Sequence, residues 1–222
     1  MQLQEKKLGT ISYYQKGEHP QLLIHTGTHG DEWSVIEPTR EYILAHTDQL
    51  PDFIYVPEVS PSAVAQKTRK NADGLDVNRN FFTTCTHPEV IDNLELINQH
   101  SFELFVSIHE DYEFSELYLY DTGLISQEKW QRSTNKLAAI NLDTYDGVDD
   151  PADPALGHRF VNGYFSSGHM QPNPHSGNLS DYLLFNHKTK RGILPEIPTQ
   201  CSTETKRRAI GLVFSELLPI LL

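Results

Sequence analysis

The sequence predicts an α/β protein with a mixed, twisted β-sheet and helices on both of its faces. Short apolar segments rich in β-branched and aromatic residues alternate along the chain with longer amphipathic ones. No repeat, low-complexity tract or long linker divides the 222 residues, so we expect a single domain spanning residues 1–222. Apolar types make up 38% of the chain, which is enough to build a core.

Local patterns place the individual elements in this order. Short runs rich in apolar and aromatic residues, several of them bounded by Gly or Pro, predict strands at residues 9–17, 21–27, 53–59, 102–109, 117–121 and 192–198. Apolar residues at helical spacing predict helices at residues 31–46, 88–99, 126–140, 179–187 and 203–221. Pro38 is expected to kink or restart the first helix. The acidic, Pro-rich stretch 146–157 is predicted as a surface turn rather than a calcium-binding loop.

Composition excludes several classes of function. Thirty acidic and 18 basic side chains give a net charge of −12, which disfavours binding to the phosphate backbone of nucleic acids. No apolar run reaches the roughly 18–20 residues that span a membrane. The first residues lack the apolar core of a signal peptide, and two cysteines make no disulfide framework, so we expect a cytoplasmic protein. The sequence does not predict an oligomeric state.

Three candidate metal ligands follow predicted strands. In open α/β sheets, ligands bind beyond the carboxyl ends of the strands. His29 and Glu32 come after the strand at 21–27 in the order His-x-x-Glu, and a helix starting near Asp31 would let both converge. His109 closes the strand at 102–109. Alone, each His is equally compatible with a capping or hydrogen-bonded role, but together they complete the His₂Glu set of several zinc hydrolases.

Other polar residues have both a functional and a structural interpretation. Arg69, Asn78 and Arg79 lie in a segment rich in Asn and Gly, which is typical either of an anion-binding loop or of a solvated turn. Glu196 lies in an apolar strand between prolines, where it is either a buried acid–base group with a raised pKa or an edge residue facing solvent. His25, inside an apolar strand, is predicted to be buried and hydrogen-bonded.

The ordered set of motifs resembles the zinc metallocarboxypeptidases of the M14 clan. The matching pieces are His-x-x-Glu at 29–32, Arg-x-Asn at 69–71, Asp-x-Asn-Arg-Asn-Phe at 76–81, a strand-end His and a late Glu-x-Pro. They extend over residues 29–199, about three quarters of the chain, and the segment 76–81 is the most specific piece. The resemblance implies a zinc-carboxypeptidase-like fold and one zinc ion held by His29, Glu32 and His109.

The resemblance also implies roles for the other polar residues. Glu196 would be the general base and proton shuttle, and Arg69 would polarise the scissile carbonyl. Asn78 and Arg79 would hold the terminal carboxylate of the substrate. The expected activity is zinc-dependent hydrolysis of the amide bond in a small, carboxylate-bearing peptide.

Two alternatives to this activity stay open. The related aspartoacylase and succinylglutamate desuccinylase group shares Gly-x-His-Gly-x-Glu and Thr-Arg…Asn-Arg, so an N-acyl amino acid is the alternative substrate. A catalytically inactive zinc-pocket binding protein is the alternative from another class. A purely structural zinc is disfavoured, because such sites are Cys-rich and both cysteines lie far from these residues in the sequence.

The chain departs from the family pattern in two respects. It is short for a carboxypeptidase domain, which predicts that loops walling the substrate pocket are missing. The family's substrate-clamping Tyr, about twenty residues before the catalytic Glu, has no counterpart in the stretch NPHSGNLSDY at 173–182. His175 is the predicted substrate-binding residue in its place, with Tyr182 as the other candidate.

Overall fold

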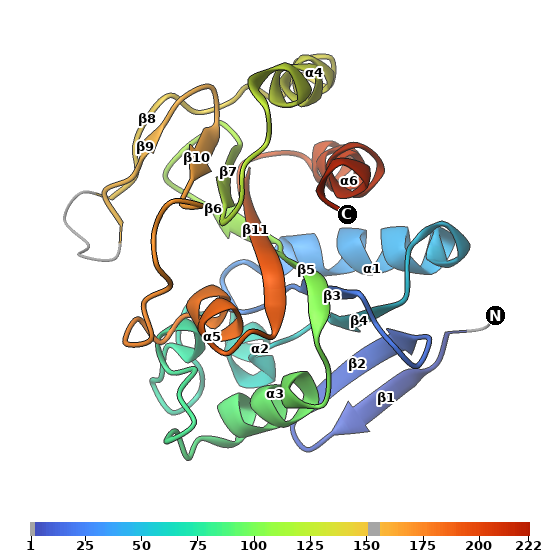
Figure 1. Cartoon of the computed structure of the whole chain (residues 1–222), viewed down its shortest axis with the longest axis vertical. Helices are drawn as coiled ribbons and strands as arrows, with labels where there is room; N and C mark the ends of the chain where they lie inside the picture. Colours follow the sequence, from blue (N-terminus) through green and yellow to red (C-terminus); the bar gives the residue numbers. More distant parts are fainter. Residues whose placement is uncertain (1–2, 151–155) are drawn as a thin grey trace.

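The computed structural model describes residues 3–150 and 156–222, and within them a nine-stranded sheet crosses the molecule (Figure 1). Eight strands follow one path in the order β1-β2-β4-β3-β5-β11-β7-β10, and β6 pairs with β11. The strands are β1 Glu5–Leu8, β2 Ile11–Lys16, β3 Leu22–His25, β4 Phe53–Val56, β5 Phe102–Ser107, β6 His109–Asp111, β7 Tyr118–Asp121, β10 Tyr164–Ser166 and β11 Thr189–Pro198. A two-stranded sheet pairs β8 (Gly147–Val148) with β9 (Arg159–Phe160).

The sheet is mixed, as predicted. Strands β4, β3, β5 and β11 are parallel neighbours in its centre. The pairs β1–β2, β2–β4 and β7–β11 are antiparallel, and the edge strand β10 is parallel to β7. Because parallel neighbours end at the same edge, the residues after β3 and β5 meet there. Strand β11 continues along that edge by pairing with β6, so Glu196 is the register partner of His109.

Helices cover both faces of the sheet. One core cluster joins the sheet to α1, α4, α6 and the π-helical turn Val213–Leu217, and the other joins it to α3 and α5. The helices are α1 Ile36–Ala45, α2 Pro61–Gln66, α3 Pro88–Asn98, α4 Gln127–Ala138, α5 Leu179–Phe185, α6 Thr203–Leu212 and α7 Leu218–Leu221. Short 3₁₀ turns form at Trp33–Val35, Thr47–Gln49 and Val77–Arg79.

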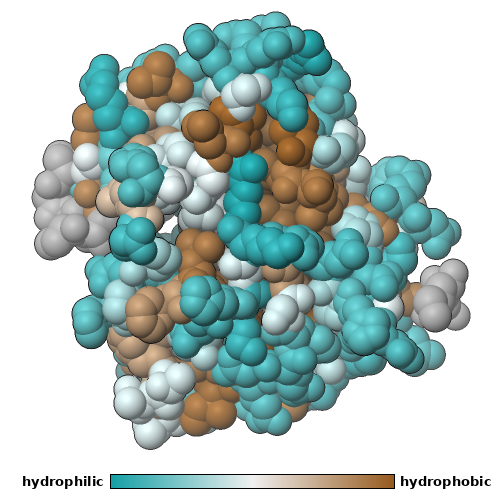
Figure 2. Space-filling model, in the orientation of Figure 1, coloured by the Kyte–Doolittle hydropathy of each residue, from teal (hydrophilic) through white to brown (hydrophobic). Residues whose placement is uncertain are grey.

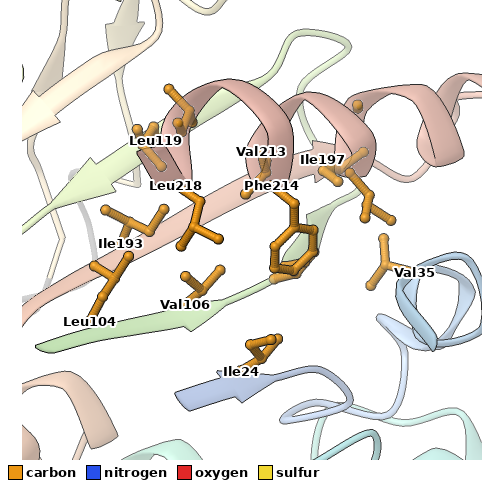
Figure 3. Packing of buried hydrophobic residues seen from close by; sticks show 14 of the residues in the cluster. Ile24, Val35, Leu104, Val106, Leu119, Ile193, Ile197, Val213, Phe214 and Leu218 are labelled. Atoms are coloured by element: carbon orange, nitrogen blue, oxygen red, sulfur yellow. The ribbon is translucent and has the colours of Figure 1, made fainter. Parts of the chain in front are cut away.

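Alternating side chains of the buried strands fill the two cores. In β3, Leu22 and Ile24 belong to the first cluster and Leu23 to the second, as the two-residue period of a strand requires. Figure 3 shows Phe214 and Leu218, at the end of the chain, directed toward the central strands of the sheet. Both are buried, with at most 5% of their surface exposed.

The predicted fold class is confirmed, but several element boundaries differ. Strand β1 was not predicted, because its charged EKKL segment is mostly exposed at the sheet edge. The expected helix at 31–46 begins only at Ile36, after a 3₁₀ turn. The expected strand at 102–109 divides at Ile108 into β5 and β6. Residues 151–155 of the predicted acidic loop lie outside the described residues, and Gly147–Val148 of that stretch form β8.

Figure 2 shows hydrophilic side chains over most of one face, with apolar ones gathered between α4 and α6. A small cavity in this region has a mainly apolar lining, formed by Leu117, Leu119, Trp130, Ser133, Leu137, Pro195, Ala209, Leu212, Val213 and Leu217. No helix within the described residues is both long and apolar enough to cross a membrane. Cys85 and Cys201 are both free thiols, as expected for a chain without a disulfide framework.

Candidate metal centre

Two glycines shape the loop that carries the first two candidate ligands. Gly27 has a φ of +58°, and its carbonyl accepts a hydrogen bond from Ser60 N at 3.0 Å. A Cβ on Gly30 would lie 1.9 Å from Ala63 O, so only glycine fits between this loop and α2. The loop therefore packs closely on α2, and His29 and Glu32 are held in it rather than in a helix. The expected helix start near Asp31 is wrong, but the two side chains still converge.

His29, Glu32 and His109 form one buried cluster at the carboxyl ends of β3 and β5. His29 Nδ1 lies 2.5 Å from Glu32 Oε1, and His109 Nδ1 lies 2.7 Å from Glu32 Oε2. One possible ligand atom from each of the three residues lies within 4.8 Å of the others, and at most 8% of any of the three is exposed. Two imidazole nitrogens and a carboxylate are a donor set that suits zinc. The cluster therefore fits the predicted metal site.

The outer nitrogens of both imidazoles face further polar groups. His29 Nε2 lies 3.4 Å from Asp76 Oδ1, and His109 Nε2 lies 2.9 Å from Ser107 Oγ. Such outer partners fix the orientation of ligating histidines and leave the inner nitrogen free for a metal. Asp76 was not among the predicted site residues, although it opens the Asp-x-Asn-Arg-Asn-Phe segment.

Electrostatics within the cluster favour a negative carboxylate between two rings. Burial alone would raise the pKa of Glu32, but the imidazoles of His109 and His29 outweigh it and lower that pKa. Burial opposes protonation of His29, but Glu32 and Asp76 raise its pKa to about 9. Asp76 is partly buried, yet its contact with His29 and the charges of Arg69 and Arg79 lower its pKa to about 2. A cation is thus favoured where these groups meet.

Glu196 is half-buried on β11 and belongs to the same electrostatic neighbourhood. Its register partners are His109 on β6 and Tyr118 on β7. Burial, with the negative charges of Glu32 and Asp111, raises the pKa of Glu196 well above its usual value, against the opposing charge of His29. The apolar strand environment suggested such a shift. A raised pKa makes a carboxyl group a better proton acceptor than an ordinary carboxylate, which suits a role in proton transfer.

The arginines and Asn78 lie on the segment that supports the cluster. Arg69 is 44% exposed at its side chain and donates from Nε to Asp76 Oδ2 at 3.1 Å. Asp76 Oδ1 accepts a hydrogen bond from Asn78 N at 3.0 Å, and Asn78 Oδ1 accepts one from Leu179 N at 3.1 Å. Arg79 is half-buried and donates to Asn78 O at 3.1 Å. Asp76 thus joins the predicted substrate-binding segment to the metal cluster.

The two candidates for the missing clamp residue have different surroundings. Tyr182 is buried in the core cluster that contains residues of α3, and its hydroxyl lies 3.1 Å from Asn98 Nδ2. The hydroxyl is thus engaged with the end of α3, and Tyr182 also lines a surface cavity, so a substrate-binding role for it stays a prediction. His175 is exposed, and its ring has no hydrogen bond with a described residue. A substrate-binding role for His175 stays a prediction.

Tyr118 and Tyr120 lie in the strand predicted at 117–121 and were not among the predicted site residues. Their hydroxyls donate to Asp111 and Asp149 respectively, and the charge of Glu196 helps to raise the pKa of both phenols after burial. Both phenol rings therefore lie close enough to Glu196 for its charge to affect them. The signal in the sequence was the two-residue spacing, which places both rings on one face of β7.

His25 is buried as predicted, but the expected hydrogen bond is absent. It is fully buried at the end of β3, and neither ring nitrogen has a hydrogen-bond partner among the described residues. Its ring instead packs edge-on against Phe105, with 5.3 Å between the ring centroids. Burial, aided by the charge of His109, lowers its pKa to about 3. His25 is therefore a neutral core residue with unpaired polar atoms.

We expect the His25→Leu variant of the metal-free protein to be more stable by about 1 kcal/mol at pH 7, because it removes unsatisfied buried nitrogens. The gain should grow as the pH falls from 6.5 toward 3. In that range His25 binds a proton in the unfolded wild-type chain but not in the folded one. Proton binding therefore favours the unfolded state of the wild type and has no such effect at this position in the variant. Urea unfolding at pH 7, 5.5 and 4.5 measures the difference. His19→Leu, at an exposed position, is the control and should show no such trend.

Comparison with known proteins shows the fold. The sequence matches no family model and no curated protein. A solved structure from Shewanella amazonensis, provisionally assigned as a metallopeptidase, superposes with a TM-score of 0.73 at 20% identity over 99% of this chain and 87% of that one. A metallo-carboxypeptidase from Burkholderia cenocepacia gives a TM-score of 0.68 at 14% identity, over 99% of this chain and 65% of that one.

A metallo-carboxypeptidase from Pseudomonas aeruginosa, in complex with (2-guanidinoethylmercapto)succinic acid, is also similar. Its TM-score is 0.63 at 17% identity, over 100% of this chain and 66% of that one. The chain thus has the zinc-carboxypeptidase fold expected from its motifs, and it spans about two thirds of the length of these two carboxypeptidases.

Proposed function

We propose that this protein is a zinc-dependent hydrolase that cleaves the amide bond of a small peptide with a free carboxylate. The observation that carries the proposal is the buried His29–Glu32–His109 cluster with Glu196 as the register partner of His109. The three ligand candidates and a carboxyl with a raised pKa are the parts that metal-assisted amide hydrolysis requires. The shared fold with solved metallo-carboxypeptidases is consistent with this chemistry.

In the proposed mechanism His29, Glu32 and His109 hold the zinc ion. When bound, zinc supplies Lewis-acid polarisation of a carbonyl oxygen and lowers the pKa of water toward about 7. Glu196 takes a proton from the attacking water and returns it to the leaving amine. The Tyr118 and Tyr120 rings limit the access of bulk water to Glu196 from the β7 side, since Tyr118 is only 5% exposed.

The arginines supply positive charge around this site. Arg69 is positioned by Asp76 and stabilises the oxyanion that develops on the scissile carbonyl. Arg79 and Asn78 bind the terminal carboxylate of the substrate, which a guanidinium matches in shape and charge. Because Asn78 Oδ1 is held by Leu179 N, its amide nitrogen is the group oriented for a substrate oxygen. This positive pocket lies in a chain with a net charge of −12.

The test is hydrolysis of a substrate panel by the zinc-loaded protein, followed by mass spectrometry. The panel pairs dipeptides and tripeptides with their C-terminal amides, and it includes N-acetylaspartate and N-succinylglutamate to represent the deacylase alternative. We expect cleavage of the free-carboxylate peptides. Exclusive cleavage of the N-acyl amino acids would move the protein to the deacylase branch. Binding of zinc and peptides without any turnover would identify it as a binding protein.

Arg79→Gln is expected to reduce kcat/KM for free-carboxylate peptides by about 10- to 100-fold, since hydrogen bonds to charged groups are worth about 1.5–3 kcal/mol. The effect should be confined to these substrates, and the slow cleavage of amidated peptides should not change. Arg132→Gln is the matched control, because the Arg132 side chain is 72% exposed on α4, where it pairs with Glu128. An equal loss on both kinds of peptide would contradict carboxylate recognition by Arg79.

A further inference from the structure

We propose that a buried network of Lys206, Glu110 and Ser34 is a positioning device that sets the separation of the two ligand-bearing segments. This inference rests on the metal site of the proposed function. It adds residues that touch neither metal nor substrate. Lys206 is 3% and Glu110 4% exposed, so both charges are removed from solvent.

The Glu110 carboxylate connects the two segments directly. Glu110 follows the candidate ligand His109 in the chain, and Ser34 lies two residues after the candidate ligand Glu32. The carboxylate accepts hydrogen bonds from Ser34 N at 2.8 Å and from Ser34 Oγ at 2.6 Å. In addition, Glu110 N lies 3.4 Å from Glu32 Oε2. Any displacement of one segment relative to the other therefore strains these contacts.

Lys206, on helix α6 near the C-terminal end of the sequence, completes the network. Its ammonium pairs with Glu110 Oε1 and donates to Ser34 Oγ at 2.5 Å and to Thr199 O at 2.9 Å, which uses all three of its protons. Thr199 follows β11, and its own N donates to Asp111 O at 2.6 Å. A single cation on α6 thus fixes the His29 loop, the strand end at His109 and the end of the strand that carries Glu196.

The location of the pair distinguishes positioning from simple stabilisation. A buried ion pair is weak evidence for stability, because well-packed apolar residues often replace it without loss. A second buried pair joins Arg191 to Asp121, which is 0% exposed. The Asp121 carboxylate also accepts hydrogen bonds from Tyr164 and Gly123 N, and among the described residues the pair makes no side-chain hydrogen bond to residues 29–34 or 109–111. Both pairs join a cation to a buried carboxylate, and of these two it is the Lys206–Glu110 pair that links the segments of the candidate ligands.

The experiment measures metal affinity separately from stability in the full-length protein. Wild type, Glu110→Gln, Lys206→Met and the milder Ser34→Ala variant are titrated with zinc against a chromophoric chelator, and urea unfolding is recorded without metal. We expect Glu110→Gln and Lys206→Met each to weaken zinc binding by about 10- to 100-fold, the range for groups that orient metal ligands. Ser34→Ala keeps both charges, and we expect it to lose affinity by a smaller factor in the same direction.

Two further measurements test how the residues act. The double variant Glu110→Gln/Lys206→Met should lose no more zinc affinity than either of its single variants, because the two residues act as one unit. The absorption spectrum of bound Co²⁺ should change in the Glu110 and Lys206 variants, since it reports ligand geometry rather than folding. Asp121→Asn, the control, should lose stability and retain wild-type zinc affinity and spectrum.

Wild-type affinity and an unchanged spectrum in Glu110→Gln or in Ser34→Ala would overturn the inference. So would an equal loss of affinity in Asp121→Asn. Failure of the proposed function has a different signature, because the wild-type protein itself would then bind no zinc or hydrolyse no substrate.

Discussion

Glu196→Gln is expected to lower kcat by about 10²- to 10⁴-fold, the usual contribution of a general acid–base group. Gln preserves the size of the side chain but cannot accept the proton from water. Zinc content and stability should stay close to wild type, because Glu196 is not one of the three clustered ligand candidates. The measurement is steady-state hydrolysis of the best peptide of the panel, with the metal content of each preparation determined.

The matched control for this substitution is Glu113→Gln, at an exposed carboxylate in the loop after β6. It should retain the wild-type kcat. A Glu196→Gln variant that turns over as fast as wild type with full zinc occupancy would remove Glu196 from the mechanism. The pH profile gives a second criterion, since the limb that reports the base in wild type should be lost in the variant.

His109→Ala is expected to weaken zinc binding by more than about 100-fold, because loss of an orienting residue alone costs 10- to 100-fold. The loss of zinc binding should also reduce the stabilisation of the fold by zinc. At a zinc concentration about 100 times the Kd, wild type should gain about 2.7 kcal/mol of unfolding free energy, and a chelator should reverse that gain. The variant should gain less than about 0.4 kcal/mol at the same zinc concentration. Urea unfolding with zinc and with chelator measures both values.

His19→Ala, an exposed His outside the cluster, controls for the loss of an imidazole. It should bind zinc as wild type does. Equal stabilisation of His109→Ala and wild type by zinc would place the metal elsewhere on the protein and contradict the His₂Glu assignment.

Most of the fold could be predicted from local patterns because its central strands are continuous apolar runs. Strand β4 and helix α3 were predicted to within three residues at each end. Strand β1 was missed because an edge strand with exposed charged side chains has no apolar signal. The start of α1 was misplaced because the loop before it is held by tertiary contacts of Gly30 with α2, which local periodicity does not encode.

The same distinction applies to the site. The cluster of His29, Glu32 and His109 was predictable, because strand ends and residue types suffice to locate it. The buried residues that support the cluster, such as Lys206 and Glu110, could not be predicted. Lys206 contacts Glu110 across 96 residues of sequence, and it lies in a helix segment, TETKRRAIGL, whose charges suggest a solvated surface. Only the three-dimensional structure shows that this one lysine is buried while Arg207 and Arg208 beside it are exposed.

The place of β11 in the sheet has a consequence for folding. This strand, residues 189–198, is inserted between β5 and β7 and pairs with β6 as well, so the centre of the sheet is closed by a segment that follows all the other strands of that sheet in the sequence. Pairing over such sequence separations is slow, because the entropy of loop closure is lost before the contacts form. Residues before β11 therefore cannot complete the candidate site, which assembles only after β11 has joined the sheet.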